Sequence, residues 1–498
     1  MTTDYRLREP LVFVAIAAVS VGVFLPAMFG APRLNESFWI DWVWLDQFVR
    51  ELAHGNLYPR WLPLSHHGLG SPVFYYYPPL GFYLGSLFVF AGLSTYAAIV
   101  ATFIAASMLS GVGVYFWSKG QSQTPLVGTL VFVIAPYHVF DFYFRGALAE
   151  AVGVSAIPFV MLGLRKISEG RSSGIPVTAV AYGALICSHL PLALLASVFL
   201  IGPYAAWRGY RAPRRLLATA TGLAIGLALA CIYLVPALGL ERYRDAKALW
   251  GTRILEPSHW TFWNADFRTG IYLVILGIGV ALAIPAAALV LRNRSRWAAY
   301  AIACILLGIG LVPLVWTAPI LRSVQFPFRI MPLAEFGLAT AFAQAAWTPR
   351  KLAEALAPLL VATAYMMVAK VPPYPVTIAE LNMLHPDVPE NLPPGERPYS
   401  WPSIWALQVA EAHSRMEFSD GVTTEPVFYF PAWSVQCGGA PAVTFAAPRT
   451  QLLSYRGMDC VRTLGITTSE KVGGALSFFG LLALIATGAI SLRRRKPS

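Results

Sequence analysis

Long apolar segments separated by short polar ones run through most of the chain, from Leu11 to Ile490. Segments of this length predict transmembrane helices, because about 20 apolar residues cross the ~30 Å hydrocarbon core of a bilayer. Twelve such segments stand at 11–29, 95–117, 125–142, 147–164, 175–190, 192–207, 216–237, 271–291, 298–317, 329–347, 355–369 and 472–491. The run from Leu80 to Ala91 is too short, at about 18 Å of helix, and is expected to lie in the membrane interface. The pattern predicts a mainly α, polytopic membrane protein of about twelve transmembrane helices.

Composition agrees with a membrane protein and excludes an ordinary soluble enzyme. Of the 498 residues, 57% are hydrophobic and 12% are charged, whereas a soluble domain carries roughly a quarter charged residues. The formal net charge is +12, but the arginines stand in short clusters between apolar segments. That distribution is typical of the positive-inside bias of membrane proteins and disfavours nucleic-acid binding.

The basic clusters indicate how the chain is threaded through the membrane. With twelve spans they all fall on one face: Arg6/Arg8, Lys119, Arg165/Lys166/Arg171, Arg208/Arg211/Arg214/Arg215, Arg292/Arg294/Arg296, Arg350/Lys351 and Arg493/Arg494/Arg495/Lys496. A thirteenth span at 80–91 would divide them between the two faces. Because lysine and arginine accumulate on the cytoplasmic side, we expect both termini to be cytoplasmic. The first segment is expected to remain as an anchor rather than a cleaved signal.

Two long segments are expected outside the membrane, at 30–94 and 371–471. The second opens with a proline-dense stretch, which favours extended backbone. Strand-like pieces separated by Pro and Gly follow at 427–430, 442–446 and 451–455. We therefore divide the chain into a transmembrane module (1–370), an external Pro-rich segment with a small β-domain (371–471), and a last helix with a basic tail (472–498).

Two of the five cysteines, Cys437 and Cys460, fall in the external segment. An even pair of cysteines on the oxidising side of a membrane predicts a disulfide. The alternative is that they are two unpaired small residues of a core.

The first external loop contains two candidate catalytic carboxylates, Asp41 and Asp46, among many aromatic residues. Aromatic rings with polar handles are typical of a segment at headgroup level. Asp41 lies on a stretch with helical periodicity, and Asp46 faces a different side of the same helix. An aspartate there can act as general base on an acceptor hydroxyl. The alternative is a solvated interfacial aspartate.

Ionisable residues near the span ends form a second set of candidates, because charge near hydrocarbon normally faces a cavity. Asp141, Arg145 and Glu150 stand at one external hairpin, and His189 and Arg329 reach the same face from other hairpins. Guanidinium groups suit a phosphate, so the candidate donor-phosphate ligands are Arg145, Arg329, Arg322 and Arg60. Structural pairing of these arginines with Asp141, Glu150 or Glu335 is the alternative, and both uses can coexist.

Metal and cofactor motifs give little signal. His66 and His67 are adjacent, and adjacent side chains rarely chelate one ion. We identify no phosphate-binding loop, dinucleotide fingerprint or His-Glu-x-x-His helix, and we therefore expect no cofactor and assign no metal ligand, although the chemistry leaves room for a divalent metal.

Several short motifs resemble known membrane proteins. The loop aspartate followed by Tyr77-Pro-Pro-Leu80 resembles the GT-C superfamily of glycosyltransferases, which use polyprenyl-phosphate sugars. Gly55 to Trp61, Gly68 to Pro72, Tyr143 to Glu150, Ser188 to Pro191 and Phe326 to Arg329 resemble bacterial membrane proteins labelled 6-pyruvoyl-tetrahydropterin synthase-related. Phe428 to Trp433 resembles the terminal β-domain of large bacterial membrane proteins proposed to act in cell-surface glycosylation.

The resemblance implies inverting transfer of a sugar from a polyprenyl-phosphate donor to an envelope glycan, lipid or protein on the external face of a bacterial inner membrane. It assigns the base to Asp41, or failing that to Asp46. Residues expected around the substrate are Tyr77, Glu150, His189 and His66. Trp42 follows Asp41, whereas many GT-C members have an adjacent acidic pair there, so a metal held by such a pair does not carry over.

Two other functions fit a polytopic membrane protein. A lipid or glycolipid transporter would be expected to show inverted repeats and binding groups at the bilayer midplane. The chain shows no internal repeat, and its polar groups gather at the external boundary. A non-catalytic scaffold presenting the β-domain is the third possibility.

Overall fold

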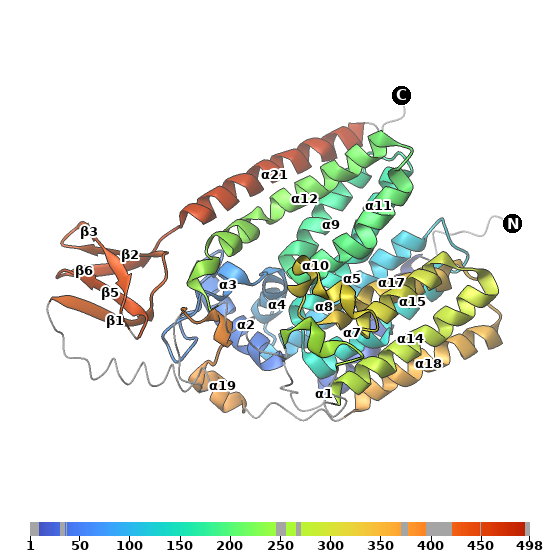
Figure 1. The fold of residues 1–498 in the computed structure, drawn as a ribbon, viewed down its shortest axis with the longest axis horizontal. Coiled ribbons are helices and arrows are strands. Elements are labelled where there is room, and N and C mark those ends of the chain that lie inside the picture. The colour runs from blue at the N-terminus through green and yellow to red at the C-terminus, as the bar shows by residue number, and fades with distance from the viewer. Residues whose placement is uncertain are drawn as a thin grey trace.

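The computed structural model describes residues 9–29, 35, 37–245, 255–264, 270–369, 377–394, 421–448 and 450–493. The chain folds into a large helical module with a small β region near the C-terminus (Figure 1). The basic clusters Arg6/Arg8 and Arg494 to Lys496, and much of the proline-dense stretch, lie outside the described residues.

Nine of the described helical segments are long and apolar enough to cross a membrane. They are α1 (Glu9–Phe29), α5 (Thr95–Ser118), α6 with α7 and the π-turn η2 (Pro125–Val133, Pro136–Phe140 and Asp141–Arg145), α8 (Leu148–Ser168), α10 with η3 and α11 (Leu190–Ala196, Ser197–Ile201 and Gly202–Gly209), α12 (Pro213–Gly239), α14 (Ile271–Asn293), α18 (Pro349–Val368) and α21 (Thr468–Arg493). The protein is therefore mainly α and has the helices of a membrane protein, as the apolar pattern predicts.

The other three predicted spans are shorter helices. The segments 175–190, 298–317 and 329–347 correspond to α9 (Gly174–Ser188), α15 (Arg296–Gly308) and α17 (Met331–Gln344). The apolar run at 298–317 is divided because Gly310 adopts a positive φ and a 3₁₀ turn, η7 (Pro313–Thr317), follows. The run at 175–190 stops at His189, which is extended between α9 and α10. Apolar runs thus locate these helices but overestimate their length.

Small residues allow the helices to approach closely. A Cβ on Gly163 of α8 would lie 2.3 Å from Oγ1 of Thr178 on α9, and one on Gly226 of α12 would lie 2.7 Å from the carbonyl oxygen of Ala179. Small residues at crossings are characteristic of membrane helices, which associate by close packing and not by exclusion of water. They bring α8, α9 and α12 together beside the site described below.

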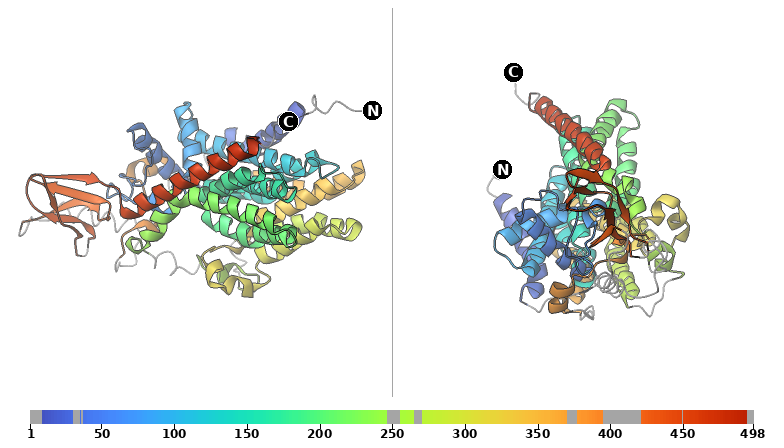
Figure 2. Two further views of the ribbon diagram at one scale, coloured as in Figure 1. Left: turned by 90° about the horizontal axis from the view of Figure 1, so that it is seen from above. Right: turned by 90° about the vertical axis from the view of Figure 1, so that its left-hand side faces the viewer.

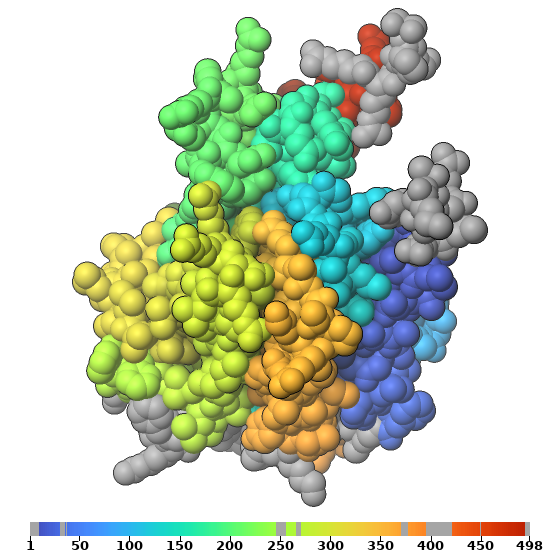
Figure 3. All heavy atoms as spheres, turned by 90° about the vertical axis from the view of Figure 1, so that its right-hand side faces the viewer, coloured from blue at the N-terminus to red at the C-terminus, as the bar shows by residue number. Residues whose placement is uncertain are grey.

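The remaining helices are short and connect or cover the long ones. They are α2 (Phe38–Ala53), α3 (Val73–Tyr76), α4 (Leu80–Phe90), η4 (Glu241–Tyr243), η6 (Pro257–Trp260), α16 (Pro319–Arg322), η8 (Pro327–Ile330), α19 (Ile378–Leu384) and η9 (Pro389–Asn391). The short helix predicted at 80–91 is α4. Figure 3 shows the end of the molecule opposite the β region, where segments from the N-terminal half (blue to green) and the C-terminal half (yellow to orange) pack side by side.

The β region consists of two antiparallel three-stranded sheets, in the orders β1-β5-β4 and β3-β2-β6. The strands are β1 (Val422–Phe428), β2 (Trp433–Cys437), β3 (Ala440–Ala442), β4 (Thr444–Ala446), β5 (Leu452–Arg456) and β6 (Cys460–Leu464). Cys437 and Cys460 are direct partners in the β2–β6 register and form a disulfide, with Cα atoms 3.9 Å apart. The predicted disulfide is confirmed.

The β region does not stand alone, because its core includes side chains of the first loop. Phe430 is buried with its ring centroid 4.5 Å from that of Tyr75 and 5.9 Å from that of Trp61. From the sheets, α21 runs back along α12 (Figures 1 and 2). At the start of α21, Glu470 lies 2.9 Å from Nε of Arg60 in the first loop. The first loop, the sheets and α21 are therefore joined.

Candidate active site

A cleft of about 440 Å³ opens where α3, the α9–α10 break, η8 and residues 388–391 meet. Its polar lining comes from distant parts of the chain, namely Tyr77, His189, Arg244, Ser323, Gln325, Arg329, Glu390 and Asn391. Its apolar lining combines the aromatic residues Trp44, Tyr76 and Tyr233 with Pro78, Leu190, Pro191, Leu194 and Val388. Clefts that combine aromatic surface with a few convergent polar groups are the usual form of small-molecule sites.

Arg329 stands at the inner end of this cleft, on the 3₁₀ turn η8 that precedes α17. Its Nη1 donates to the carbonyl oxygen of Val324 at 2.8 Å and to Oε1 of Gln325 at 3.2 Å, which fixes the guanidinium. Its Nε lies 3.4 Å from Oε2 of Glu150. Arg329 and Glu150 thus come together from separate hairpins, as we expected from the sequence.

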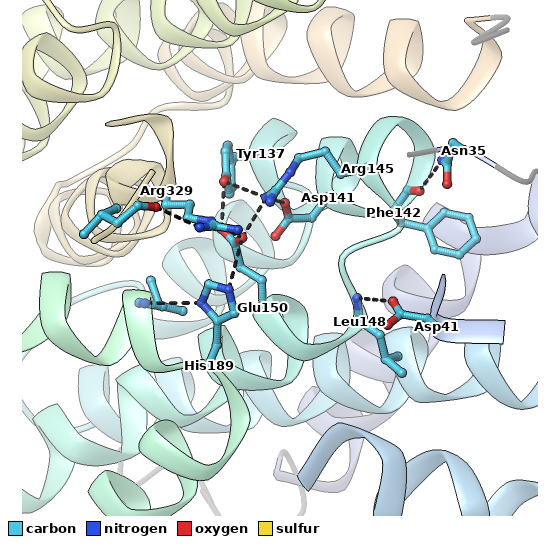
Figure 4. A network of polar contacts seen from close by, with 12 residues as sticks. Asn35, Asp41, Tyr137, Asp141, Phe142, Arg145, Leu148, Glu150, His189 and Arg329 are labelled. Carbon is cyan, nitrogen blue, oxygen red and sulfur yellow. Dashed lines mark hydrogen bonds and ion pairs between the residues drawn. The ribbon is translucent and has the colours of Figure 1, made fainter. Parts of the chain in front are cut away.

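Arg145 lies behind Arg329 in a buried ionic network (Figure 4). Its Nη1 is 2.7 Å from Oδ1 of Asp141 and 2.7 Å from Oε2 of Glu150, and it also donates to the hydroxyl of Tyr137 at 3.2 Å. The Tyr137 hydroxyl in turn donates to Oε1 of Glu150 at 2.8 Å. Arg145 therefore forms ion pairs with protein carboxylates, which was the alternative to phosphate binding, and it does not line the cleft.

The π-turn η2 explains how Asp141 and Arg145 face inward together. It is followed by Gly146 in the left-handed region at φ 69°, where the glycine avoids a clash with Phe38. The side-chain amide of Asn35 donates to the backbone carbonyl oxygens of Phe142 and Tyr143 in this turn, at 3.0 and 2.9 Å. The segment before α2 thus holds the hairpin that carries the ionic network.

His189 lies between the cleft and Glu150. Its Nδ1 accepts a hydrogen bond from the backbone N–H of Leu192 at 3.2 Å, which caps α10. Its Nε2 is 3.8 Å from Oε2 of Glu150. Because Nδ1 is the acceptor, a neutral His189 carries its proton on Nε2, directed at the carboxylate.

Asp41 lies at the N-terminal end of α8, apart from the Arg145 network in Figure 4. Its Oδ2 accepts a hydrogen bond from the backbone N–H of Leu148 at 3.1 Å. Burial raises the pKa of Asp41 well above its ordinary value, and this outweighs the lowering by that hydrogen bond. Burial, and next the negative charge of Asp41, also raise the pKa of Tyr77, which lines the cleft. Asp41 itself is buried and does not line the cleft.

Four of the predicted site residues lie elsewhere. Asp46 pairs with Arg50 at 2.9 Å on the outer face of α2, and Arg322 is exposed, 3.6 Å from Glu256 beside a separate hollow. Arg60 pairs with Glu470 and also donates to the carbonyl oxygen of Ile232 at 2.9 Å. His66 is buried against Phe428 of β1.

Five polar residues of the cleft were not identified as site residues from the sequence, namely Arg244, Ser323, Gln325, Glu390 and Asn391. Arg244 follows η4 at the end of α12, and its Nη2 donates to Oε1 of Glu241 at 2.8 Å. The cluster Arg242-Tyr-Arg244 after a long apolar segment is a signal that could have found it. Glu390 and Asn391 stand in the Pro-rich segment, where nothing in the local sequence indicates a site.

Among the described residues, no three His, Cys, Asp or Glu side chains gather in an arrangement that could hold a metal ion. The polar side chains of the cleft are two guanidinium groups, an imidazole, a carboxyl, two amides, a serine hydroxyl and phenols. Such a set suits an anion at the arginines and hydroxyl groups elsewhere.

Comparison with known proteins identifies the family. Residues 74–373 match the model described as "6-pyruvoyl-tetrahydropterin synthase related domain; membrane protein", which covers more than half of the chain. The chain belongs to this family of membrane proteins, as the motifs indicated. No curated protein matches the sequence.

Three solved membrane enzymes are similar to the chain. Arabinofuranosyltransferase AftD from Mycobacteria is 17% identical with a TM-score of 0.47, over 71% of this chain and 26% of that one. The oligosaccharyltransferase from Archaeoglobus fulgidus is 14% identical with a TM-score of 0.36, over 82% and 56%. ArnT from Cupriavidus metallidurans, bound to undecaprenyl phosphate, is 12% identical with a TM-score of 0.35, over 92% and 98%. The chain thus spans about a quarter of the length of the mycobacterial enzyme.

Proposed function

We propose that this protein is a membrane glycosyltransferase that transfers a sugar from a polyprenyl-phosphate donor to an envelope acceptor in the cleft. The observation that carries the proposal is the pairing of Arg329 and Arg244 on the wall of one aromatic cleft. Guanidinium groups bind phosphate oxygens by forked, charge-assisted hydrogen bonds. Tyr77 and Pro78, from the Tyr77-Pro-Pro-Leu80 motif that resembles GT-C enzymes, also line this cleft.

The charges around the cleft favour Arg244 and Arg329 over Arg145 as phosphate ligands. Arg145 has two carboxylates at 2.7 Å, whereas Arg329 has one at 3.4 Å. Arg244 pairs with Glu241, whose side chain is 43% exposed, and a partly exposed pair is weak. A donor phosphate can therefore bind the guanidinium groups of Arg244 and Arg329 without breaking the ion pairs of Arg145 with Asp141 and Glu150.

The reaction proposed is a single inverting displacement. Asp41 accepts the proton of the acceptor hydroxyl, the hydroxyl oxygen bonds to the anomeric carbon, and the bond from that carbon to the donor phosphate oxygen breaks. The polyprenyl phosphate leaves with both electrons of that bond, and Arg329 and Arg244 stabilise its charge. For this step the acceptor hydroxyl has to come within hydrogen-bond distance of Asp41, which does not itself line the cleft.

The topology proposed with this function has twelve spans, counting α9, α15 and α17 with the nine long helices. Both termini are then cytoplasmic, and the cleft and the sheets lie on the periplasmic face of a bacterial inner membrane. The basic clusters all fall on one face when twelve spans are counted, and this supports the orientation. Cysteine-accessibility labelling at Arg171→Cys and Arg211→Cys on the same face, opposite to Gly421→Cys, is the expected result.

The donor site is tested by binding of undecaprenyl phosphate to the full chain in lipid nanodiscs. We expect Arg329→Ala and Arg244→Ala each to weaken binding about tenfold or more, as loss of a charge-assisted hydrogen bond implies. Arg329→Lys should also weaken it, because the fork is lost although the charge remains. Arg322→Ala is the matched control, since Arg322 lies beside a different hollow. If Arg329→Ala and Arg244→Ala both leave the affinity for undecaprenyl phosphate unchanged, the proposed donor site is wrong.

Catalysis is tested by comparing envelope glycans of cells that lack the gene with cells that carry Asp41→Asn. Asparagine retains an oxygen that can accept the hydrogen bond from Leu148, so α8 keeps its cap. It cannot accept a proton at neutral pH. Matching glycan defects in the two strains, with normal amounts of the variant protein, are expected, and normal glycans in the Asp41→Asn strain would contradict the assignment of the base.

A further inference from the structure

The outer wall of the cleft is made by a segment that precedes the β region. Residues 385–392, which we call the strap, are tied at both ends to other parts of the chain. The backbone N–H of His66 donates to the carbonyl oxygen of His385 at 3.1 Å, and that of Asp245 donates to the carbonyl oxygen of Leu392 at 3.0 Å. Leu392 is fully buried among the aromatic residues that join the sheets to the first loop. The strap is thus a fixed wall of the cleft.

One buried carboxylate, Asp387, organises the strap against α2. Its Oδ1 accepts hydrogen bonds from the indole Nε1 of Trp44 at 3.0 Å, the backbone N–H of Val388 at 2.7 Å and the amide Nδ2 of Asn391 at 3.3 Å. Trp44, Val388 and Asn391 all line the cleft. Asp387 therefore fixes an aromatic ring and an amide on the same wall without lining it.

The groups on this wall are suited to a neutral, hydroxyl-rich ligand. Trp44 and Tyr76 present aromatic surface, and Glu390, Asn391 and Arg244 present hydrogen-bonding groups of both signs. Glu390 would repel an anionic group placed against the strap, whereas Arg244, to which the donor phosphate is proposed to bind, would repel a cationic side chain. A sugar avoids both conflicts, because its C–H face packs on an aromatic ring while its hydroxyls donate to a carboxylate and accept from an amide or guanidinium.

We propose that the outer part of the cleft, between the strap and Trp44, is an acceptor subsite for carbohydrate, in which Glu390 and Asn391 bind sugar hydroxyls and Asp387 positions Trp44 and Asn391. The inference rests on the proposed glycosyl transfer and names its acceptor as a glycan. It also gives the Pro-rich segment a part in substrate selection.

Binding of simple sugars to the full chain in nanodiscs tests the subsite, with saturation-transfer NMR as the readout. The probes are the methyl glycosides of glucose, galactose, mannose, N-acetylglucosamine and xylose. We expect at least one to bind, and Glu390→Gln to weaken that binding about tenfold or more. The matched control is Glu380→Gln, because Glu380 lies on α19 of the same segment but caps that helix through Thr377. A glutamine retains this capping role.

The positioning role of Asp387 is tested with two variants. Asp387→Asn keeps an oxygen that can accept from Trp44, so glycoside binding should be largely retained. Asp387→Leu removes the acceptor and should weaken glycoside binding about tenfold, while undecaprenyl-phosphate binding stays unchanged. A merely structural role predicts instead that both ligands lose affinity together.

The outcomes separate this inference from the proposed function. Wild-type protein that binds undecaprenyl phosphate but none of the glycosides, or glycoside binding that is unchanged by Glu390→Gln, would overturn the subsite. A third outcome is that glycoside binding depends on Glu390 while Arg329→Ala and Arg244→Ala leave the affinity for undecaprenyl phosphate unchanged. This result would support the carbohydrate subsite and contradict the proposed donor site.

Discussion

Nη1 of Arg145 lies 2.7 Å from Oε2 of Glu150, at the point where the π-turn η2 gives way to α8, and both side chains are almost completely buried. The same nitrogen lies 2.7 Å from Oδ1 of Asp141. One guanidinium thus joins the end of one membrane segment to the start of the next. A charge pair in such surroundings is costly to break, because the partner left behind stays buried.

Arg145→Ala should therefore lower the stability of the folded protein by about 3–5 kcal/mol, or prevent its accumulation. Thermal unfolding and folded yield in detergent micelles measure this. Arg350→Ala is the control, because Arg350 forms an exposed i,i+4 pair with Glu354 at 2.9 Å, worth about 0.3–0.5 kcal/mol. Equal stability of the two variants would show that the buried network contributes little.

The transfer rate should depend on pH through Asp41. Burial raises the pKa of this carboxyl above its ordinary value of 3.8, so the ionised base accumulates only at higher pH. We expect the rate to rise tenfold per pH unit and then level off, with the plateau displaced upward from that of an ordinary aspartate. A rate that is constant from pH 4 to pH 8 would contradict a catalytic role.

The raised pKa of Asp41 affects stability in the opposite direction, because the rate is expected to rise with pH while this contribution to stability falls. A carboxyl whose pKa is raised on folding binds its proton more tightly in the folded state, so its contribution to stability is lost as the pH rises through that raised pKa. Thermal unfolding at pH 5 and pH 8 should therefore differ less in Asp41→Asn than in the wild-type protein. Equal pH dependence in both proteins would indicate that Asp41 titrates normally.

The crossing of α8 and α9 should tolerate no side chain at Gly163. A Cβ there would meet both Oγ1 and the backbone nitrogen of Thr178, at 2.3 and 2.7 Å, and backbone cannot move aside cheaply. Gly163→Ala is expected to destabilise the protein by about 1–3 kcal/mol. Gly277→Ala in α14 is the control, because nothing lies within 4 Å of its added Cβ, and alanine favours a helix by about 0.5–1 kcal/mol.

Loss of the disulfide should loosen the sheets but spare the helices. Cys437 and Cys460 enclose a loop with a sequence separation of 23 residues, for which chain entropy predicts about 3 kcal/mol. Cys437→Ser should make the 421–464 region sensitive to limited proteolysis at protease concentrations that leave α8 and α12 intact. Identical cleavage patterns for the wild-type protein and Cys437→Ser would mean that packing on Phe430 keeps the sheets folded without the disulfide.

Much of the fold follows from patterns that are local in the sequence. Apolar runs located the helices, and the pairing of Cys437 with Cys460 followed from compartment and number. Helix ends did not follow, because Gly310 and the extended His189 interrupt apolar sequence for reasons set by packing. Nor did the joining of the sheets to the first loop, since the contact of Phe430 with Tyr75 is long-range and carries no local signal.

The site was predictable where charge stands in apolar sequence. Arg145, Glu150, His189 and Arg329 were chosen for that reason, and the structure brings them together. Arg60 has the same signal but pairs with Glu470, because an arginine at a membrane boundary satisfies a structural carboxylate as readily as a ligand. Glu390 and Asn391 had no signal, since polar residues are ordinary in a Pro-rich segment and only their tertiary position gives them a role.

The ion pair between Arg60 and Glu470 has a consequence for biosynthesis. Arg60 is synthesised early, whereas its partner Glu470 is synthesised with α21, after the other membrane helices that the structure describes. Until then the first loop lacks both that partner and the sheets that pack on Tyr75. A nascent chain arrested before residue 467 would therefore contain every residue that lines the cleft and still lack the carboxylate that pairs with Arg60 of the first loop.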